Sequence, residues 1–431
     1  MKPLHFAVIG LLVGSALVAL TPAQAQPSAG PKMATKDAGG PGGGEAYDCD
    51  PRLKWRITVV DGADADVGEY NSLAIPTVGP YSGRPGISYW DRTNGDLKYA
   101  QWNGSQWQVG EPVDSVGDVG RLTSLAFSPD EGLPYISYVS YYGVDLTPHW
   151  LKVACLPDWE MDWQTAVWYT ELNHGYAAHS SSLKFRLGTP VVAVRGHYPG
   201  IPHDAGLLYF EEPLVPTPIE GGKYAGYRCS MAIDPADSNE RPAIAYTGPD
   251  WGVLKYASSE DAADWDIDNV VYEDDAGWFC SLAFFPPAHP VFPGQPAIAY
   301  HDGNTDSLNF AWRDGDDWNH CIVVRAVERG AVLGRYPSLA ILPNGHPAIS
   351  FAKDRLSGPA ELRYAYHNAN NFNFCEGWNW DTVDDEGQVG SHTSLAILPT
   401  RLPVISYYDT TNGDLKCAFR RASVDVEVDE R

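Results

Sequence analysis

The feature that most constrains the fold of this chain is a unit that recurs seven times. Its first phrase, a Ser followed by three mostly apolar residues, begins at Ser72, Ser124, Ser182, Ser230, Ser281, Ser338 and Ser394. The spacings of 52, 58, 48, 51, 57 and 56 residues are close to those of propeller and solenoid repeats. Each first phrase is followed by a second, such as Gly86-Ile-Ser-Tyr89, and a third, such as Leu97-Lys-Tyr-Ala100, and a Trp often opens a fourth. The sequence therefore predicts seven copies of one four-part unit.

Each phrase has the pattern of a β-strand. Apolar residues alternate with small or polar ones, and Ile, Val, Tyr and Phe are frequent, which suits a pleated, half-buried surface. The first strand is apolar on both faces, so we expect it to be innermost. A Pro precedes every second strand, where it can start a strand without interrupting a ladder. Asn94-Gly95 and Asn412-Gly413 fit hairpin turns, because both central residues of such a turn need a positive φ.

Four antiparallel strands in each of seven units predict an all-β, seven-bladed β-propeller. The alternative is an open solenoid. The seventh copy reaches only its third strand, at 415–419, whereas Trp55–Asp61 resembles the fourth strands that begin at Trp265 and Trp318. We therefore expect an N-terminal strand to complete the last blade and close the ring, which removes its edges. Residues 423–429 also alternate, and they are a weaker candidate for an additional strand.

Composition agrees with this architecture and excludes several classes of protein. Gly (42) and Pro (34) are frequent among the 431 residues, and 12% of residues are aromatic. A disordered chain would be poor in aromatic residues, a helical bundle would carry less Gly and Pro, and collagen would need Gly at every third position. The chain has 55 acidic and 30 basic residues and a net charge of −25. No nucleic-acid partner is expected, because phosphate binding needs a basic surface.

The first residues have the pattern of a signal peptide. Lys2 supplies the positive start, residues 6–20 are apolar, and Ala23-Gln24-Ala25 has the small residues that precede a cleavage site. The apolar stretch is shorter than the roughly 20 residues needed to span a bilayer. We therefore expect export with cleavage after Ala25, which makes the mature protein secreted or periplasmic, without insertion into a membrane.

Four regions follow from these patterns. Residues 1–25 are the expected signal peptide, 26–48 a flexible Gly/Pro-rich linker, 49–420 the propeller and 421–431 an acidic C-terminal tail. The partner that we expect is a glycan or a surface protein, and we expect the protein to be a monomer.

All seven cysteines lie after the expected cleavage site, at Cys49, Cys155, Cys229, Cys280, Cys321, Cys375 and Cys417. An oxidising compartment permits disulfides, but an odd number leaves at least one thiol free or paired with another chain. The sequence alone does not decide the pairing, since many arrangements are compatible with it. The motif Cys-x-x-Cys is absent, so neither a zinc ribbon nor a thioredoxin-type redox site is indicated.

The repeated phrases resemble those of secreted bacterial seven-bladed propellers of the sialidase-like and lectin-like group. The resemblance rests on Ser-Leu-Ala-Ile, on Pro-x-Ile-Ser-Tyr-Tyr-Asp and on Asn-Gly-Asp-Leu-Lys-Tyr-Ala, and it covers about residues 53–419. It implies the fold, but one fold hosts many functions. The Asp-box Ser-x-Asp-x-Gly-x-x-Trp and a Phe-Arg-Ile-Pro phrase are absent from the sequence, so sialidase activity is not expected.

In propellers of this group, the loops that enter the first strand and leave the second share one face around the central channel. Applied to this chain, that geometry predicts a ligand-binding face. Its candidate residues are Tyr70, Trp90, Arg121, Arg195, Trp251, Trp278, Tyr336, Lys353, Arg355 and His392. Trp and Tyr can stack on sugar rings, and Arg can bind a carboxylate or sulfate with its fork of donors. The alternative is that several of these residues only bridge neighbouring blades.

Three functions remain open from the sequence. We favour a non-catalytic propeller that binds a glycan or surface polymer, because aromatic and Arg residues recur while catalytic motifs are absent. The second hypothesis is a polysaccharide lyase, in which a His or Tyr abstracts the proton next to a uronic acid carboxylate and an Arg neutralises that carboxylate. The lyase candidates are His179, His197, Tyr227, Arg228, His301 and Arg335. The third hypothesis is an extracellular protein-interaction scaffold.

Metal binding has weak support in the sequence. Asp302, Asn304 and Asp306 place oxygen atoms at alternate positions, as a calcium loop does, but the twelve-residue pattern with its terminal Glu is missing. The twelve His are scattered, which argues against zinc. We therefore expect no cofactor, and calcium is the only ion that the sequence brings into consideration.

Overall fold

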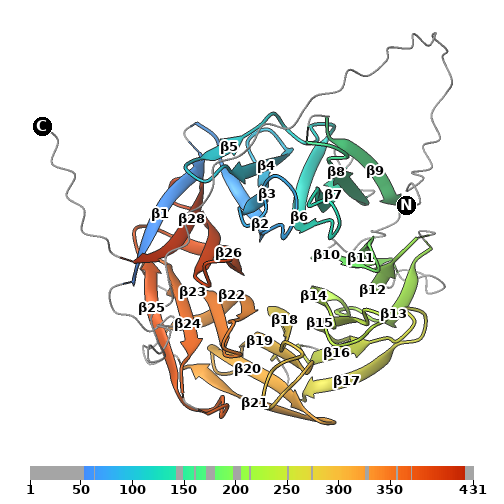
Figure 1. Cartoon of the computed structure of the whole chain (residues 1–431), viewed down its shortest axis with the longest axis vertical. Coiled ribbons are helices and arrows are strands. Elements are labelled where there is room, and N and C mark those ends of the chain that lie inside the picture. The colour runs from blue at the N-terminus through green and yellow to red at the C-terminus, as the bar shows by residue number, and fades with distance from the viewer. Residues whose placement is uncertain are drawn as a thin grey trace, which may run out of the picture. The chain divides into compact units, whose positions relative to one another are not determined.

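The structure is a computed structural model, and its described residues form a ring of seven four-stranded antiparallel sheets (Figure 1). It describes residues 53–62, 64–141, 149–159, 162–170, 180–197, 205–212, 215–249, 252–272, 275–325, 330–355, 358–369 and 371–422. The expected signal peptide, the linker, Cys49 and residues 423–431 lie outside them. All described elements are strands, which confirms the predicted all-β seven-bladed propeller.

The blades follow one another along the chain. Blade 1 consists of β2 (Val67–Ala74), β3 (Gly86–Asp91), β4 (Asp96–Trp102) and β5 (Trp107–Val109). Blade 2 consists of β6 (Asp118–Phe127), β7 (Pro134–Tyr141), β8 (His149–Cys155) and β9 (Gln164–Tyr169). Blade 3 consists of β10 (Ser181–Arg186), β11 (Thr189–His197), β12 (Ala205–Phe210) and β13 (Thr217–Gly221).

The remaining blades have the same order. Blade 4 consists of β14 (Tyr227–Ile233), β15 (Pro242–Thr247), β16 (Leu254–Ser258) and β17 (Asp266–Val271). Blade 5 consists of β18 (Cys280–Phe284), β19 (Pro296–Asp302), β20 (Ser307–Asp314) and β21 (Asp317–Val324). Blade 6 consists of β22 (Ala331–Ile341), β23 (Pro347–Arg355), β24 (Glu361–His367) and β25 (Trp378–Asp384). Blade 7 consists of β26 (Val389–Ile397), β27 (Pro403–Asp409), β28 (Asp414–Ala422) and β1 (Leu53–Asp61).

The ring is closed by the two ends of the repeat, as the sequence predicts. β1 pairs antiparallel with β28, with Trp55 opposite Arg420 and Thr58 opposite Cys417, so the first strand of the chain is the outermost strand of the last blade. Closure of the ring by pairing the two ends leaves no open end in the array of blades. The strand β28 ends at Ala422, two residues beyond the expected end of the propeller.

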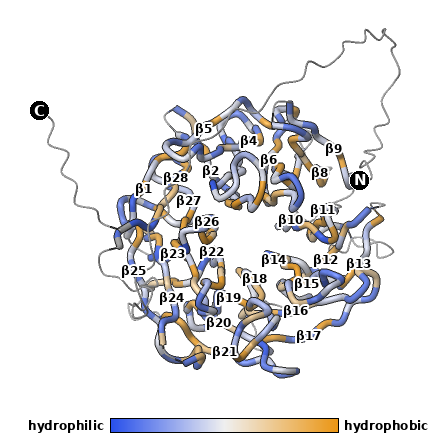
Figure 2. Tube along the Cα trace, viewed as in Figure 1, coloured by the Kyte–Doolittle hydropathy of each residue, from blue (hydrophilic) through white to orange (hydrophobic). Residues whose placement is uncertain are grey.

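The hydrophobic core lies between the blades. Every residue of β3, β15, β19 and β27 is buried, and apolar residues recur along the strands of each blade (Figure 2). Core clusters combine residues of adjacent blades, such as Phe310 of blade 5 with Phe351 of blade 6. Burial on both faces explains why the second strands read as nearly continuous apolar runs.

The repeated Ser of the first phrase connects each blade to the next. Its hydroxyl oxygen accepts a hydrogen bond from the backbone N–H of the residue after the equivalent Ser in the following blade, at 2.9–3.0 Å. The seven bonds run through the whole ring, and Ser394 closes it by accepting from Leu73 of blade 1. The Ser that marks each repeat in the sequence therefore has a structural role, because it joins neighbouring blades.

A second repeated contact joins four pairs of blades through a carboxylate. Asp114, at the end of blade 1, accepts hydrogen bonds from Tyr138 Oη at 2.6 Å and from Lys152 Nζ, both of blade 2. The same contact occurs at three other junctions. There the equivalent Tyr and Lys of blades 1, 4 and 7 donate hydrogen bonds to the carboxylates of Asp61, Glu220 and Asp384. The Tyr and Lys of the second and third phrases thus serve the blade junctions.

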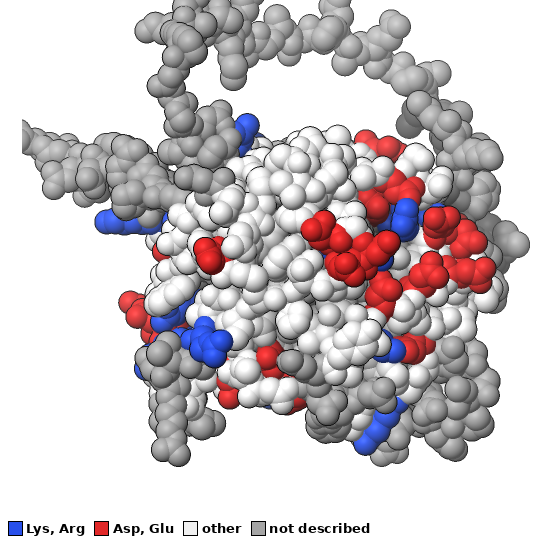
Figure 3. All heavy atoms as spheres, turned by 90° about the horizontal axis from the view of Figure 1, so that it is seen from below, with Lys and Arg blue, Asp and Glu red and all other residues white. Residues whose placement is uncertain are grey.

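The outer surface agrees with the acidic composition. On the edge of the ring drawn in Figure 3, Asp and Glu outnumber Lys and Arg. Within the described residues, no helix has the length and hydrophobicity needed to cross a bilayer.

Candidate functional site

In blades 1, 2, 4, 6 and 7, the innermost strand has a bulge just before the repeated Ser, and this bulge turns one side chain towards the channel. In blade 2, Arg121 lies opposite Val139 and Ser124 lies opposite Ser137. An interval of three residues on β6 is therefore paired with an interval of two residues on β7. The bulge therefore holds Leu122 and Thr123, and the backbone at Leu122 has a φ of 56°. A left-handed conformation is costly for a residue other than Gly, and the surrounding structure must stabilise it.

The position two residues before the repeated Ser forms a ring of seven side chains. Its members are Tyr70, Leu122, Ser180, Arg228, Phe279, Tyr336 and His392. Five of them have φ between 50° and 56°, namely Tyr70, Leu122, Arg228, Tyr336 and His392. Strained backbone of this kind concentrates at functional sites. We call these seven residues the channel ring.

Glycine makes the approach to this bulge possible. Gly120 precedes Leu122 by two residues, and a Cβ added to it would lie 2.7 Å from Cα of Leu97 in the preceding blade. A Cβ added at the equivalent glycine of other blades would likewise contact the equivalent Leu of the preceding blade, as it would at Gly68, Gly226, Gly334 and Gly390. Only glycine fits so close to the preceding blade, which explains the recurrent pattern Gly-x-x-x-Ser. The middle residue of this pattern is the one that faces the channel.

Hydrogen bonds from the following blade hold the bulge carbonyls. Thr123 Oγ1 donates to the carbonyl of Tyr70 at 2.6 Å, Ser181 Oγ to Leu122 at 2.7 Å, Cys280 Sγ to Arg228 at 3.1 Å and Thr393 Oγ1 to Tyr336 at 3.0 Å. These bonds fix the backbone and so preorganise the side chains of the channel ring.

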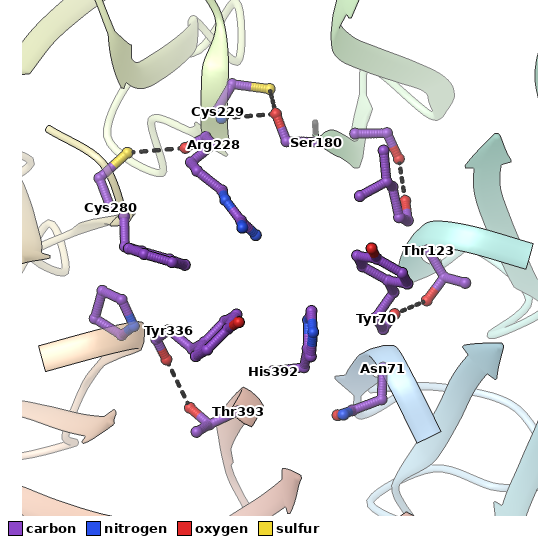
Figure 4. Close-up of a pocket in the computed structure, with 14 residues that line it drawn as sticks. Tyr70, Asn71, Thr123, Ser180, Arg228, Cys229, Cys280, Tyr336, His392 and Thr393 are labelled. Carbon is purple, nitrogen blue, oxygen red and sulfur yellow. Dashed lines mark hydrogen bonds between the residues drawn. The ribbon is translucent and has the colours of Figure 1, made fainter. Parts of the chain in front are cut away.

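The channel ring encloses an open pocket of about 200 Å³ (Figure 4). Arg228, Tyr336, His392 and Tyr70 point towards its centre, and Ser180 lies on the arc between Arg228 and Tyr70. Leu122 also lines the pocket. One wall of the pocket therefore consists of aromatic and cationic side chains, and the other consists of smaller side chains.

The aromatic wall is continuous. Ring centroids are 4.7 Å apart for Phe279 and Tyr336, 4.5 Å for Tyr336 and His392, and 4.7 Å for His392 and Tyr70. Trp90 extends it behind Tyr70 at 6.0 Å. Each ring supports the orientation of the next.

Arg228 is the cation of the pocket. Its guanidinium lies 4.4 Å from the Phe279 ring centroid and 5.7 Å from that of Tyr336. Among the described residues, no carboxylate forms an ion pair with it. In a chain with a net charge of −25, a guanidinium that rests on aromatic rings and faces an open pocket is available to an anion.

Four of the other basic candidates from the sequence have carboxylate partners. Arg121 pairs with Asp118 at 2.9 Å, Arg335 with Asp354 at 3.2 Å, and Lys353 and Arg355 both pair with Glu361, at 3.3 and 2.8 Å. Arg121 also lies over the rings of Trp90 and Tyr141. These contacts neutralise charges that the sequence alone suggested as anion sites.

Burial sets the protonation of the aromatic wall. It lowers the pKa of His392 to about 3, with a further contribution from the Arg228 charge. It also raises the pKa values of Tyr70 and Tyr336, while Arg228 acts in the opposite direction on both. At neutral pH, His392 is therefore an uncharged imidazole and the two tyrosines are phenols.

The remaining candidates lie beside the pocket. Tyr227 and Trp278 form an aromatic cluster with Tyr224, with centroids 5.9–6.1 Å apart, and the buried Arg195 lies 4.6 Å from the Tyr227 ring. His301 is buried, and its Nδ1 is 2.8 Å from the carbonyl oxygen of Leu333. Burial lowers its pKa. His197 ends β11, half-buried, and does not line the pocket.

Two sequence candidates, His179 and Trp251, lie outside the described residues. In the turn proposed for calcium, the Asp302 carboxylate accepts hydrogen bonds from Asn304 N and Thr305 Oγ1, and Asp306 has a φ of 50°. The buried Asp302 therefore caps its own turn. Within the part of the chain that the structure describes, no three His, Cys, Asp or Glu residues gather as metal ligands would.

Sequence reasoning missed Leu122, Ser180, Phe279 and the two pocket thiols Cys229 and Cys280. The pattern Gly-x-x-x-Ser finds all of them except Ser180, whose unit has Ala178 in place of the glycine, because the third residue of the pattern faces the channel.

Comparisons with known proteins identify the fold. No protein-family model matches the chain, and no curated protein matches it in sequence. A protein of unknown function from Dyadobacter fermentans matches with a TM-score of 0.53 and 13% identity, over 86% of this chain and all of that one. An ulvan lyase of a polysaccharide lyase family, solved with -[GlcA(1-4)Rha3S]-, matches with a TM-score of 0.53 and 14% identity, over 84% and 95% of the two chains.

A Hadza microbial sialidase is similar at a TM-score of 0.47 and 12% identity, over 82% of this chain and 65% of that one. At these identities the likeness concerns the fold alone. The site of this chain therefore has to be interpreted from its own residues.

Proposed function

We propose that the protein is a carbohydrate-binding propeller whose channel-ring pocket takes an anionic sugar without cleaving it. The observation that carries the proposal is Arg228, which faces an open pocket on a support of aromatic rings. A planar guanidinium suits a uronate carboxylate or a sugar sulfate, because both offer two oxygens to its fork of donors.

The two walls of the pocket suggest how the sugar is oriented. The apolar face of a sugar ring would lie along Tyr336 and Tyr70, while its anionic group would approach Arg228. The opposite wall is lined by the hydroxyl oxygens of Ser180 and Thr123, which can only accept from sugar hydroxyls because they donate their own protons to the carbonyls of Gly226 and Tyr70. A cavity of about 200 Å³ has room for a sugar residue rather than for a folded polymer segment.

The protonation of the pocket supports binding without cleavage. A general base works best when its pKa lies near the working pH. His392 has a pKa of about 3 and is a weak base, and burial moves Tyr70 and Tyr336 away from the phenolate that would abstract a proton. The lyase hypothesis therefore has less support than binding among the described residues.

The structural neighbours support a carbohydrate ligand in general terms. The ulvan lyase, with a TM-score of 0.53, was solved with a glycan whose printed formula contains GlcA and Rha3S. That ligand belongs to the other protein. It agrees with an anionic sugar as the class to test first.

The test is a titration of the wild type and Arg228→Gln with oligosaccharides of a uronic acid polymer and of a sulfated polymer. Loss of the guanidinium should weaken binding at least about tenfold, because a hydrogen bond to a charged group contributes about 1.5–3 kcal/mol. Arg56→Gln removes the same charge from the exposed outer strand β1 and should leave binding unchanged. Equal affinities of all three proteins would contradict the site.

Absorbance from unsaturated product separates binding from lysis in the same samples. We expect no new absorbance at neutral pH over many hours. Progressive formation of unsaturated oligosaccharide by the wild type would replace the binding proposal by the lyase hypothesis.

A further inference from the structure

The cysteines at the junction of blades 5 and 6 differ from the other described cysteines. Cys321 lies on β21, the outermost strand of blade 5, and Cys375 lies in the loop between β24 and β25 of blade 6. Both are free thiols in the structure, and Cys375 is exposed to solvent. Cys155, Cys229 and Cys417 are buried, and Cys280 lines the channel pocket.

The two thiols meet across the junction. Cys321 Sγ donates to the carbonyl oxygen of Phe374 at 2.9 Å, and that carbonyl belongs to the peptide plane that leads to Cys375. Burial raises the pKa of the Cys321 thiol, and the neighbouring Cys375 thiol raises it further. The hydrogen bond from Cys321 Sγ to the Phe374 carbonyl therefore brings the Cys321 thiol next to the backbone of Cys375, and such proximity is what a disulfide between the two residues requires.

The loop that carries Cys375 is anchored on both sides. Phe374 is fully buried in the cluster that joins blades 5 and 6, and its carbonyl also accepts from Trp378 Nε1 at 2.6 Å. On the other side, the carbonyl of Asn373 contacts the His367 ring nitrogen at 3.2 Å. Cys375 is therefore held against β21 by the packing of its neighbours.

We propose that Cys321 and Cys375 form a disulfide that joins blade 5 to blade 6 when the protein meets a disulfide oxidant. The thiolate of the exposed Cys375 attacks one sulfur of a small disulfide such as oxidised glutathione and releases one glutathione thiolate. Cys321 then loses its proton to solvent and attacks the Cys375 sulfur, which expels the second glutathione. Two protein thiols are oxidised, one external disulfide is reduced, and two protons are released with the two thiolates.

The order of the two steps follows from exposure. Burial raises the pKa of the Cys321 thiol, so it is a poor attacking group towards reagents in solution. Cys375 meets the oxidant first, and Cys321 acts as the resolving thiol because it is already in contact. The Cys321→Ser variant should therefore accumulate a mixed disulfide at Cys375 that the wild type does not retain.

Mass spectrometry after alkylation and digestion with trypsin, without reduction, tests this directly. Cleavage after Arg and Lys gives peptides 314–325 and 364–401, each of which contains one cysteine. After treatment of the full chain with oxidised glutathione, we expect these two peptides to be linked, and the link to be absent from Cys375→Ser. A Cys155→Ala control should retain it.

Stability gives a second measurement. The oxidised wild type should have a higher Tm than the reduced protein, whereas Cys375→Ser should show no difference on reduction. Glutathione that persists on Cys375 of the wild type, with peptide 314–325 alkylated at Cys321, would overturn the proposal. The same holds if Cys321→Ser and wild type retain equal amounts of the adduct.

Discussion

Arg228 and His392 decide the charge of the channel pocket. Both occupy the strained bulge position, with φ of 50° and 54°, and both face the same cavity. The positive charge belongs to Arg228 alone, because His392 is neutral above about pH 3. The pocket therefore keeps a constant charge over the physiological range, and its affinity for an anion should be flat between pH 5 and 8.

The depressed pKa of His392 also predicts an acid-sensitive stability. Its ordinary pKa of 6.5 applies to the unfolded chain, so between pH 6.5 and 3 the unfolded state binds more protons than the folded state. Stability is then fully present above pH 6.5 and falls as the pH is lowered towards 3. One pKa unit corresponds to about 1.4 kcal/mol of unfolding free energy.

His392→Asn tests this prediction, since Asn tolerates the left-handed backbone better than most residues. Urea denaturation at pH 7 and pH 4.5 should show a smaller loss of unfolding free energy in the variant, by more than about 1 kcal/mol. An identical loss in both proteins would show that His392 does not carry the effect.

At the scale of the element, the repeated Ser holds the inner strands together. Ser124 is buried and accepts from the N–H of the fully buried Leu183 at 2.9 Å. Ser124→Ala leaves that N–H without a partner and should lower the unfolding free energy by about 1–3 kcal/mol. Ser115→Ala, at an exposed position, should change it by less than about 0.5 kcal/mol in the same urea titration. A variant of Ser124 as stable as the control would mean that the ring of hydrogen bonds is dispensable.

Substitutions at the carboxylate junctions should lower the unfolding free energy more than Ser124→Ala does. Asp114 and Lys152 are both buried, and Asp114→Asn leaves the ammonium of Lys152 without its countercharge. Breaking such a pair costs about 3–5 kcal/mol of unfolding free energy. The double variant Asp114→Asn/Lys152→Met should recover much of the loss, because it removes the stranded charge. Equal stability of the single and double variants in guanidinium would contradict this account.

At the scale of the whole molecule, the ring depends on one strand from the far end of the chain. Without residues 53–61, β28 has an unpaired edge, and Tyr89 and Lys98 of blade 1 lose Asp61. We expect this truncation to abolish a single cooperative unfolding transition, measured by circular dichroism. A synthetic peptide of residues 49–62 should restore it in trans. Full cooperativity without the peptide would mean that closure by β1 is not required.

The sequence predicts the fold of this molecule better than its site. The counted repeat and the likeness of Trp55–Asp61 to other fourth strands are enough for seven blades and their closure, because strand patterns are local. The carboxylate partners of Arg335 and Lys353 lie on neighbouring strands, so their neutralisation is invisible in single phrases, whereas the partner of Arg121, Asp118, lies three residues earlier on the same strand. The availability of Arg228 is visible only when the ring is assembled.

The most direct measurement of the central claim compares one uronic acid polymer with its carboxyl-reduced counterpart, titrated calorimetrically into the wild type and into Arg228→Gln. The two polymers differ only in the charge that Arg228 is proposed to bind. We predict that carboxyl reduction weakens binding to the wild type at least about tenfold and has little effect on the variant, because each change removes one half of the same contact. Equal sensitivity of both proteins to carboxyl reduction, or equal affinity of the wild type for both polymers, would contradict the assignment of the channel ring as a site for an anionic sugar.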